Sequence, residues 1–202
     1  MMTKYVDPSY FKRLCELAPE DVCKRASCQY EKGSRRYVIQ VWGHEYAIYP
    51  ETGTIKPIQD CAYKPHEYFY LFIIYYLIHV TDMTISAEWI SEKDMPGGTT
   101  FFRGPHVIPT YLITQAYNNN LQLFKKSCEQ LGGTKINLAG AAFLFHITSR
   151  IPIAVLYWEG DDDFPAESKI LFDKSITHHL TLDIIFSIAV EICIRIAKNI
   201  QL

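Results

Sequence analysis

Residues 141–158 read AAFLFHITSRIPIAVLYW and hold two apolar runs, 141–148 and 151–158, which Ser149 and Arg150 separate. Apolar runs of this length between polar residues are typical of strands buried in a sheet. Pro152 lies at the start of the second run, where a missing N–H costs no ladder hydrogen bond. We therefore predict two adjacent strands, and we expect His146, in the middle of the first, to be a buried core residue with a main-chain partner.

Other strands are expected on both sides of this pair. Apolar side chains alternate along Arg36–Tyr49 and the residues Trp42–Glu45 interrupt them, which predicts a β-hairpin. A turn signal follows, and then a short strand around Thr54–Lys56. The run ILFD at Ile170–Asp173 predicts a further short strand.

Helical spacing of apolar residues recurs in four segments: Pro8–Arg25, interrupted at Pro19, then Pro65–Thr81, Pro109–Leu131 and Thr181–Asn199. Strands do not alternate one for one with helices, which favours an α+β fold over a doubly wound sheet. We predict one α+β domain over residues 1–202. In it, a small antiparallel or mixed sheet, formed by the N-terminal hairpin and the C-terminal strands, packs against three long apolar helices.

The composition excludes several classes of protein. The chain has 202 residues, 49% of them hydrophobic, and a formal net charge of −2, so it fits neither a disordered chain nor a typical nucleic-acid-binding protein. The apolar run 68–80 is too short to span a membrane, and the run 180–200 carries Asp183, Glu191 and Arg195, which are costly at mid-bilayer. We therefore expect no nucleic acid and no membrane span.

The six cysteines contain no C-x-x-C pair, so the spacing typical of zinc or iron–sulfur sites is missing. Cys15, Cys23 and Cys28 lie close enough in sequence to be ligands, but free cysteine more often behaves as a small buried hydrophobe. The segment 1–10 has no apolar core of the kind that a secretory signal needs. These features predict free cysteines, no metal site and a cytoplasmic location.

A stretch dense in glycine and proline, 96–106, is the first candidate site, because long ordered loops often carry function. Gly97 and Gly98 offer main-chain N–H groups to an anionic or planar ligand, and Phe101 adds an aromatic ring. Arg103 supplies a forked donor for carboxylates, and His106 supplies a metal ligand or acid–base group. The alternative is a glycine-rich turn that packs its phenylalanines into the core.

The second candidate is the run WEGDDDFP at Trp158–Pro165. Its carboxylates do not follow the spacing of a calcium loop, so a solvated turn is the simpler interpretation. Trp158 and Phe164 flank the acids and would supply apolar walls for a pocket in which Glu159 is the polar group.

Histidines near the last helix form a third set. Asp173, His178 and His179 contain the residue types of a metal triad, but neighbouring histidine side chains diverge. The sequence also contains neither G-x-S-x-G nor H-E-x-x-H, so no catalytic motif is indicated.

Three segments resemble a family of unknown function, numbered 3786, from anaerobic bacteria and archaea. They are the hairpin YVIQVWGHEYAIYPETGTI, the loop WISEKDMPGGTTFFRGPHVIP, and the closing segment with its W-E-G-D-x-x-F-P run. The resemblance would cover roughly residues 10–200. Some relatives carry an added cysteine-rich iron–sulfur segment that this chain lacks. The resemblance implies a setting in anaerobic cofactor or one-carbon metabolism and assigns no catalytic residue.

The leading hypothesis is a binding protein for a planar or anionic cofactor, such as a corrinoid, haem or another tetrapyrrole. Its cofactor-binding residues would be Gly97, Gly98, Phe101, Arg103, His106, Trp158 and Glu159. One alternative is a small enzyme that uses Glu159, Asp161 or Asp173 with His106 or His178. Another is a non-catalytic interaction module that docks through exposed aromatic side chains.

Overall fold

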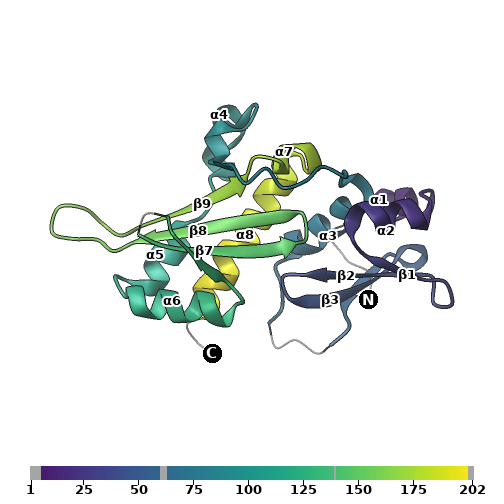
Figure 1. The fold of residues 1–202 in the computed structure, drawn as a ribbon, viewed down its shortest axis with the longest axis horizontal. Coiled ribbons are helices and arrows are strands. Elements are labelled where there is room, and N and C mark those ends of the chain that lie inside the picture. Colours follow the sequence, from purple (N-terminus) through teal and green to yellow (C-terminus); the bar gives the residue numbers. More distant parts are fainter. Residues whose placement is uncertain (1–5, 60–62, 139, 200–202) are drawn as a thin grey trace.

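A computed structural model describes residues 6–59, 63–138 and 140–199 (Figure 1). The predicted α+β class is confirmed, because the helices are accompanied by two antiparallel sheets. The strands that we expected in one sheet divide between a small N-terminal sheet and a larger C-terminal one. A main-chain hydrogen bond from Trp42 N to Ile147 O, 2.7 Å long, joins the turn of the small sheet to the large sheet.

The small sheet follows the chain in order and contains β1 (Gln29–Glu31), β2 (Arg36–Val41), β3 (His44–Tyr49) and β4 (Thr54–Pro57). The predicted hairpin is β2–β3. Trp42 and Gly43 form its two-residue turn with φ values of 47° and 75°. Two successive positive φ values define the turn type whose twist matches that of a hairpin. Pro50–Thr52 then forms the short 3₁₀ helix η1.

The large sheet has the strand order β5-β9-β8-β7-β6, and all its pairs are antiparallel. Its strands are β5 (Trp89–Ile90), β6 (Thr134–Ile136), β7 (Ala141–Thr148), β8 (Ile151–Trp158) and β9 (Glu167–Asp173). The two predicted central strands, β7 and β8, are confirmed with the predicted bounds. Strand β9 begins three residues before the predicted ILFD run and pairs with β8 from Trp158↔Glu167 onward.

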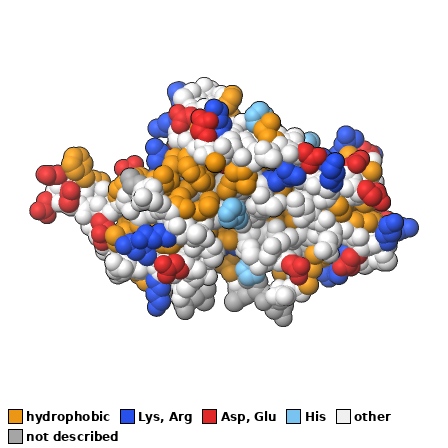
Figure 2. Space-filling model, in the orientation of Figure 1, with side chains coloured by type: hydrophobic (Ala, Val, Ile, Leu, Met, Phe, Trp, Pro, Cys, Tyr) orange, Lys and Arg blue, Asp and Glu red, His pale blue; other side chains and the backbone are white. Residues whose placement is uncertain are grey.

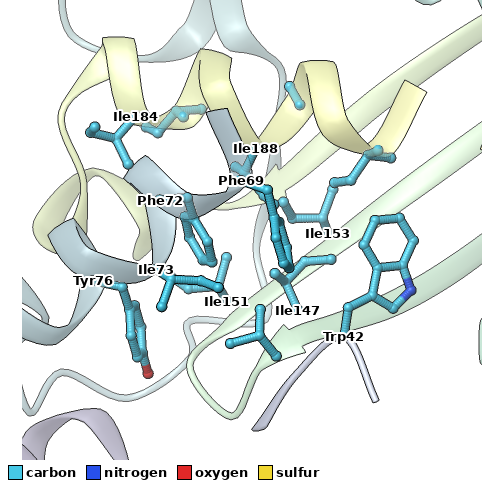
Figure 3. Close-up of a cluster of buried hydrophobic side chains, with 14 of the residues drawn as sticks. Trp42, Phe69, Phe72, Ile73, Tyr76, Ile147, Ile151, Ile153, Ile184 and Ile188 are labelled. Carbon is cyan, nitrogen blue, oxygen red and sulfur yellow. The ribbon is translucent and has the colours of Figure 1, made fainter. Parts of the chain in front are cut away.

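Helices α3 (Glu67–His79) and α8 (Leu182–Lys198) pack against each other and supply the centre of the core. Figure 3 shows Phe69, Phe72 and Ile73 of α3 and two isoleucines of α8 against isoleucines of β7 and β8, with Trp42 at the edge of the cluster. The predicted interruption at Pro19 is confirmed, because α1 (Pro8–Cys15) and α2 (Pro19–Ala26) are separate helices.

The predicted long helix over Pro109–Leu131 is wrong in its middle. Two helices, α5 (Tyr111–Tyr117) and α6 (Leu121–Gln130), replace it. Asn118 and Asn119 have φ values of 42° and 63° between them. Asparagine tolerates this left-handed conformation better than most residues, and the conformation ends an α-helix.

Short elements occupy the segment expected to be a long ordered loop. They are η2 (Glu92–Asp94), α4 (Gly98–Phe101) and η3 (Gly104–His106). In another part of the chain, the short helix α7 (Ile176–His179) precedes α8. Within the described ranges, no helix combines the length and apolarity that crossing a membrane would require.

Candidate functional site

The glycines of the predicted loop serve its own packing. Gly97 has a φ of 77° and is the N-cap residue of α4. The N–H of Gly98 donates to Met95 O at 2.8 Å, and a methyl group on Gly98 would overlap the main-chain oxygen of Glu92. The close approach of two backbone segments therefore requires glycine at position 98, and its N–H is already used.

The aromatic residues of this loop lie against helix α8. The ring of His106 stacks on Phe101, with centroids 4.5 Å apart and planes 10° apart, and meets Phe186 of α8 edge-on at 5.5 Å. Arg103 is exposed, and its side chain has no hydrogen bond or ion pair within the described ranges. Phe101, His106 and Phe186 thus form an aromatic cluster at the surface, and the exposed Arg103 lies between two of its members in the chain.

Trp158 and Glu159 lie elsewhere, at the end of β8. Glu159 Oε1 accepts a hydrogen bond from Leu121 N at 3.2 Å and so contributes to the first turn of α6. Trp158 lies beside Gly140, on the face of the sheet that points away from α8. The seven residues expected to share one cofactor site therefore form two groups, one beside α8 and one at the end of β8.

The acidic run forms the turn between β8 and β9. Asp161 Oδ1 accepts hydrogen bonds from Asp163 N and Phe164 N at 2.9 and 2.8 Å, which holds the turn in one conformation. Asp162 and Asp163 stay exposed, and Phe164 is 71% exposed. This turn, residues 159–165, is called the acidic arm below. It projects beyond the rest of the molecule in Figure 1 and carries red and orange side chains at its tip in Figure 2.

The two histidines of the third predicted set, His178 and His179, lie in different environments. His178 is exposed, whereas His179 is buried and receives a 3.3 Å hydrogen bond from Thr81 N at Nδ1. Burial, aided by Arg150, lowers the pKa of His179, so its ring is held neutral. Across the described part of the chain, no group of three His, Cys, Asp or Glu side chains has the arrangement of a metal site.

Asp173 is a buried carboxylate whose hydrogen bonds hold a neighbouring segment. Burial alone would raise its pKa, but hydrogen bonds from Ser175 and Ser86 outweigh that effect and lower it. Ala87 N also donates to Asp173, at 2.7 Å. These bonds place the segment that leads into β5, where Trp89 pairs with Asp173.

The expectation for His146 is wrong, because its side chain is exposed. Antiparallel partners share a face, so His146 lies on the same face as its partner Pro152, away from the core. The reason is that only the odd-numbered residues of β7 from Phe143 to Ile147 point into the helix-covered core. His146 also borders a pocket of about 330 Å³ between β7, the Trp42–Gly43 turn and the end of α6.

One face of the large sheet is apolar and is not covered by a helix of the described chain. Its buried centre is formed by Ala142, Ala154 and Leu156, and the half-buried apolar side chains around it are Trp89, Ile136, Leu138, Trp158 and Leu171. We call these eight residues the open face. Figure 2 shows hydrophobic side chains gathered over these strands, and Figure 1, in the same orientation, shows α8 behind them.

Comparison with known proteins gives a family and no function. Residues 18–195 match the family described as a domain of unknown function, DUF3786. The chain belongs to this family. No curated protein and no solved structure matches it. For this DUF3786 protein, only the arrangement of its own residues indicates its chemistry.

A buried ion pair on α8 contacts the turn of the small sheet and helix α3. Arg195, 4% exposed, donates from Nε to Glu191 Oε1 at 3.0 Å, and its guanidinium lies 4.3 Å from the ring centroid of Trp42 and 5.1 Å from that of Phe69. Burial raises the pKa of Glu191, and the attraction of Arg195 opposes this shift. The i,i+4 spacing in the sequence indicates this pair, whereas its aromatic surroundings come from segments far away in the chain.

The open face was missed at the sequence level, although its signal was present. Strand β9 alternates buried Ser168, Ile170 and Phe172 with more exposed residues, and one of these is the apolar Leu171. An apolar residue on the outward side of a strand whose inward side is already buried indicates a two-sided apolar sheet. Trp158 was singled out from the sequence, but as the wall of a pocket rather than as part of a flat face.

Proposed function

We propose that the protein is a non-catalytic interaction module that binds a partner protein on the open face of its large sheet. The observation that carries this proposal is the apolar face with Trp89 near one end of β9 and Trp158 near the other. Ligand sites for small molecules are usually concave, whereas a flat aromatic surface is buried best by another protein. Tryptophan is also the residue type most enriched among the side chains that dominate binding energy.

The charges at the edge of this face indicate the chemistry of the partner. Glu167 is exposed opposite Trp158, the exposed acids at 159 and 161–163 follow Trp158 in the chain, and Lys169 is a base on the same side of β9 as Glu167. Complementary potentials speed association and reject wrong partners. We therefore expect a partner surface that is apolar at its centre and basic where it meets the acidic arm.

Site-specific photo-crosslinking in cells that express the full chain tests this proposal. A photoreactive phenylalanine analogue at Leu171 lies on the open face, and the same analogue at Gly33, in the exposed turn after β1, is the matched control. The expected result is a crosslink from position 171 to one other protein, absent from position 33. Reversing two charges of the arm, with Asp162→Lys and Asp163→Lys, should weaken it.

Two results would overturn the proposal. Crosslinks from position 171 only to a second copy of the chain would show that the open face mediates self-association. An unchanged crosslink in the charge-reversal variant would show that the partner surface is not basic where it meets the acidic arm. Once a partner is identified, Trp89→Ala should weaken binding by about 2 kcal/mol, roughly 30-fold in Kd.

The cofactor hypothesis is tested separately by titrating the purified protein with haem and with cobalamin and recording visible spectra. The exposed Arg103, which lies in the chain between the stacked rings of Phe101 and His106, is the feature that favours it. If the spectral changes are saturable and His106→Ala abolishes them, the ligand is a planar cofactor and not a partner protein.

A further inference from the structure

Two thiols meet where helix α2 ends. The helix closes with Ser27 in the left-handed conformation, at φ 53° and ψ 47°, and Cys28 N donates to Cys23 O at 3.1 Å. This reversal of the chain brings the side chains on either side of the turn into contact. The two Sγ atoms lie 3.9 Å apart, and the Cys28 thiol is within reach of both Cys23 Sγ and, at 4.0 Å, Val22 O.

The two sulfurs are in contact but not at bonding distance. A disulfide joins sulfurs about 2.05 Å apart and requires Cα atoms within about 7 Å. The main-chain hydrogen bond between the same two residues keeps their backbones together, so we expect side-chain rotation to close the gap. Both cysteines are half-buried, in contrast to Cys128 and Cys193, which are fully buried.

The two thiols differ in environment, and this difference indicates which of them reacts first. Burial raises the pKa of both, but for Cys23 the hydrogen bond from Cys28 acts in the opposite direction and stabilises the thiolate. Cys23 therefore forms a thiolate more readily than Cys28. In thiol–disulfide exchange the thiolate is the attacking species.

We propose that Cys23 and Cys28 are a redox modification site that forms a reversible disulfide by exchange with a small-molecule disulfide such as oxidised glutathione. The Cys23 thiolate attacks one glutathione sulfur, breaks the glutathione disulfide bond and releases the first glutathione as its thiolate. Cys28 then loses its proton and attacks Cys23 Sγ, which releases the second glutathione. The two cysteines lose two electrons and two protons, and oxidised glutathione becomes two molecules of glutathione.

The position of the turn would transmit the change to the rest of the fold. Arg25, between the two cysteines, donates from Nη1 to the carbonyl oxygens of Ile78 and Val80 at the end of α3. Its own carbonyl accepts a 2.7 Å hydrogen bond from Arg150 Nε, in the turn between β7 and β8. A disulfide that rigidifies the turn therefore acts on a point where α2, α3 and the large sheet meet.

The test uses the full chain, with Cys61→Ser to remove the cysteine outside the described residues. Reduced protein is incubated with oxidised glutathione, quenched with acid, alkylated and digested with trypsin. Trypsin cleaves at Lys24 and Arg25, so a disulfide is detected as two peptides that stay linked until a reductant is added. We expect this linkage in the native protein, with a rate that rises about tenfold from pH 7 to pH 8 as the thiolate fraction grows.

Matched variants separate the roles. Cys28→Ser should stop at a mixed disulfide between Cys23 and glutathione, Cys23→Ser should abolish the reaction of this pair, and Cys15→Ser should leave it unchanged. The proposal is overturned if both cysteines stay reduced while the exposed Cys15 is glutathionylated. It is equally overturned if the linkage forms only after the protein is unfolded in urea.

Discussion

Replacing Asp173 by asparagine should destabilise the edge of the open face selectively. Oδ1 of Asp173 accepts hydrogen bonds from the N–H and the hydroxyl of both Ser86 and Ser175, and Oδ2 accepts from Ala87 N. The asparagine amide has nearly the same shape, but it carries no charge and replaces one acceptor oxygen with a donor. The substitution therefore weakens four bonds and turns the fifth into a contact between two donors.

The burial of the partners sets the magnitude. Ser86 and Ala87 are exposed, so water replaces much of what they lose, whereas Ser175 is 2% exposed. A hydrogen bond to a charged group exceeds a neutral one by about 1 kcal/mol, which gives roughly 2 kcal/mol for the two bonds from Ser175. The donor–donor contact at Ala87 adds about 1 kcal/mol, so we expect a loss of about 3 kcal/mol in the free energy of unfolding.

The same substitution predicts a change in acid stability. The folded-state pKa of Asp173 is lowered, so its contribution to stability is present above the unfolded pKa of about 4 and is lost as the pH falls through the folded value. The difference in unfolding free energy between wild type and Asp173→Asn should therefore be constant near pH 7 and shrink below about pH 4.

Urea unfolding followed by circular dichroism measures the global loss, and hydrogen–deuterium exchange locates it. Exchange should accelerate in residues 84–90, which lead into β5, and should change little in α3. Asp162→Asn is the matched control, because Asp162 is exposed in the acidic arm. A loss below about 0.5 kcal/mol, within the usual range of surface substitutions, or unchanged exchange at 84–90 would refute the reasoning.

Three further substitutions test other parts of the fold. Gly98→Ala should destabilise the protein by at least about 2 kcal/mol in urea unfolding, because the new methyl group would overlap a main-chain oxygen of η2, whereas Gly33→Ala, with open space around it, should be neutral. Glu191→Leu should cost about 3–5 kcal/mol by leaving a buried arginine unpaired, and adding Arg195→Met should restore most of that loss in a double-mutant cycle. Asp161→Ala should leave the melting temperature nearly unchanged but speed proteolysis of the acidic arm, since the two side-chain bonds to the turn are lost and only the main-chain bond from Asp161 N to Phe164 O remains across it.

Local patterns predicted the elements whose interactions lie within the element or with a sequence neighbour. The hairpin β2–β3 follows from alternation and the turn signal at Trp42–Glu45, which the structure narrows to Trp42–Gly43, and the break between α1 and α2 follows from Pro19. Strands β1, β5 and β6 were not predicted. They are two or three residues long, and only pairing with a longer strand makes them strands.

The candidate site shows the same division. Sequence spacing singled out the residues of the 96–106 loop and of the acidic arm, but it could not show that the loop lies beside α8 while the arm projects beyond the end of β8. It also placed His146 in the core, because His146 lies among apolar residues in the middle of a predicted strand. Which face of a strand is covered depends on where helices far away in sequence pack.

The sequence by itself determined an α+β chain with a hydrophobic core, the bounds of β7 and β8, and the composition of the acidic arm. Those properties depend on periodicity and on residue type, which are local. Only the tertiary structure decided that the strands form two sheets, that Cys23 meets Cys28, and that the helices leave one apolar face of the large sheet uncovered. Each of these depends on the three-dimensional arrangement of the chain, and most depend on contacts between segments that are distant in sequence.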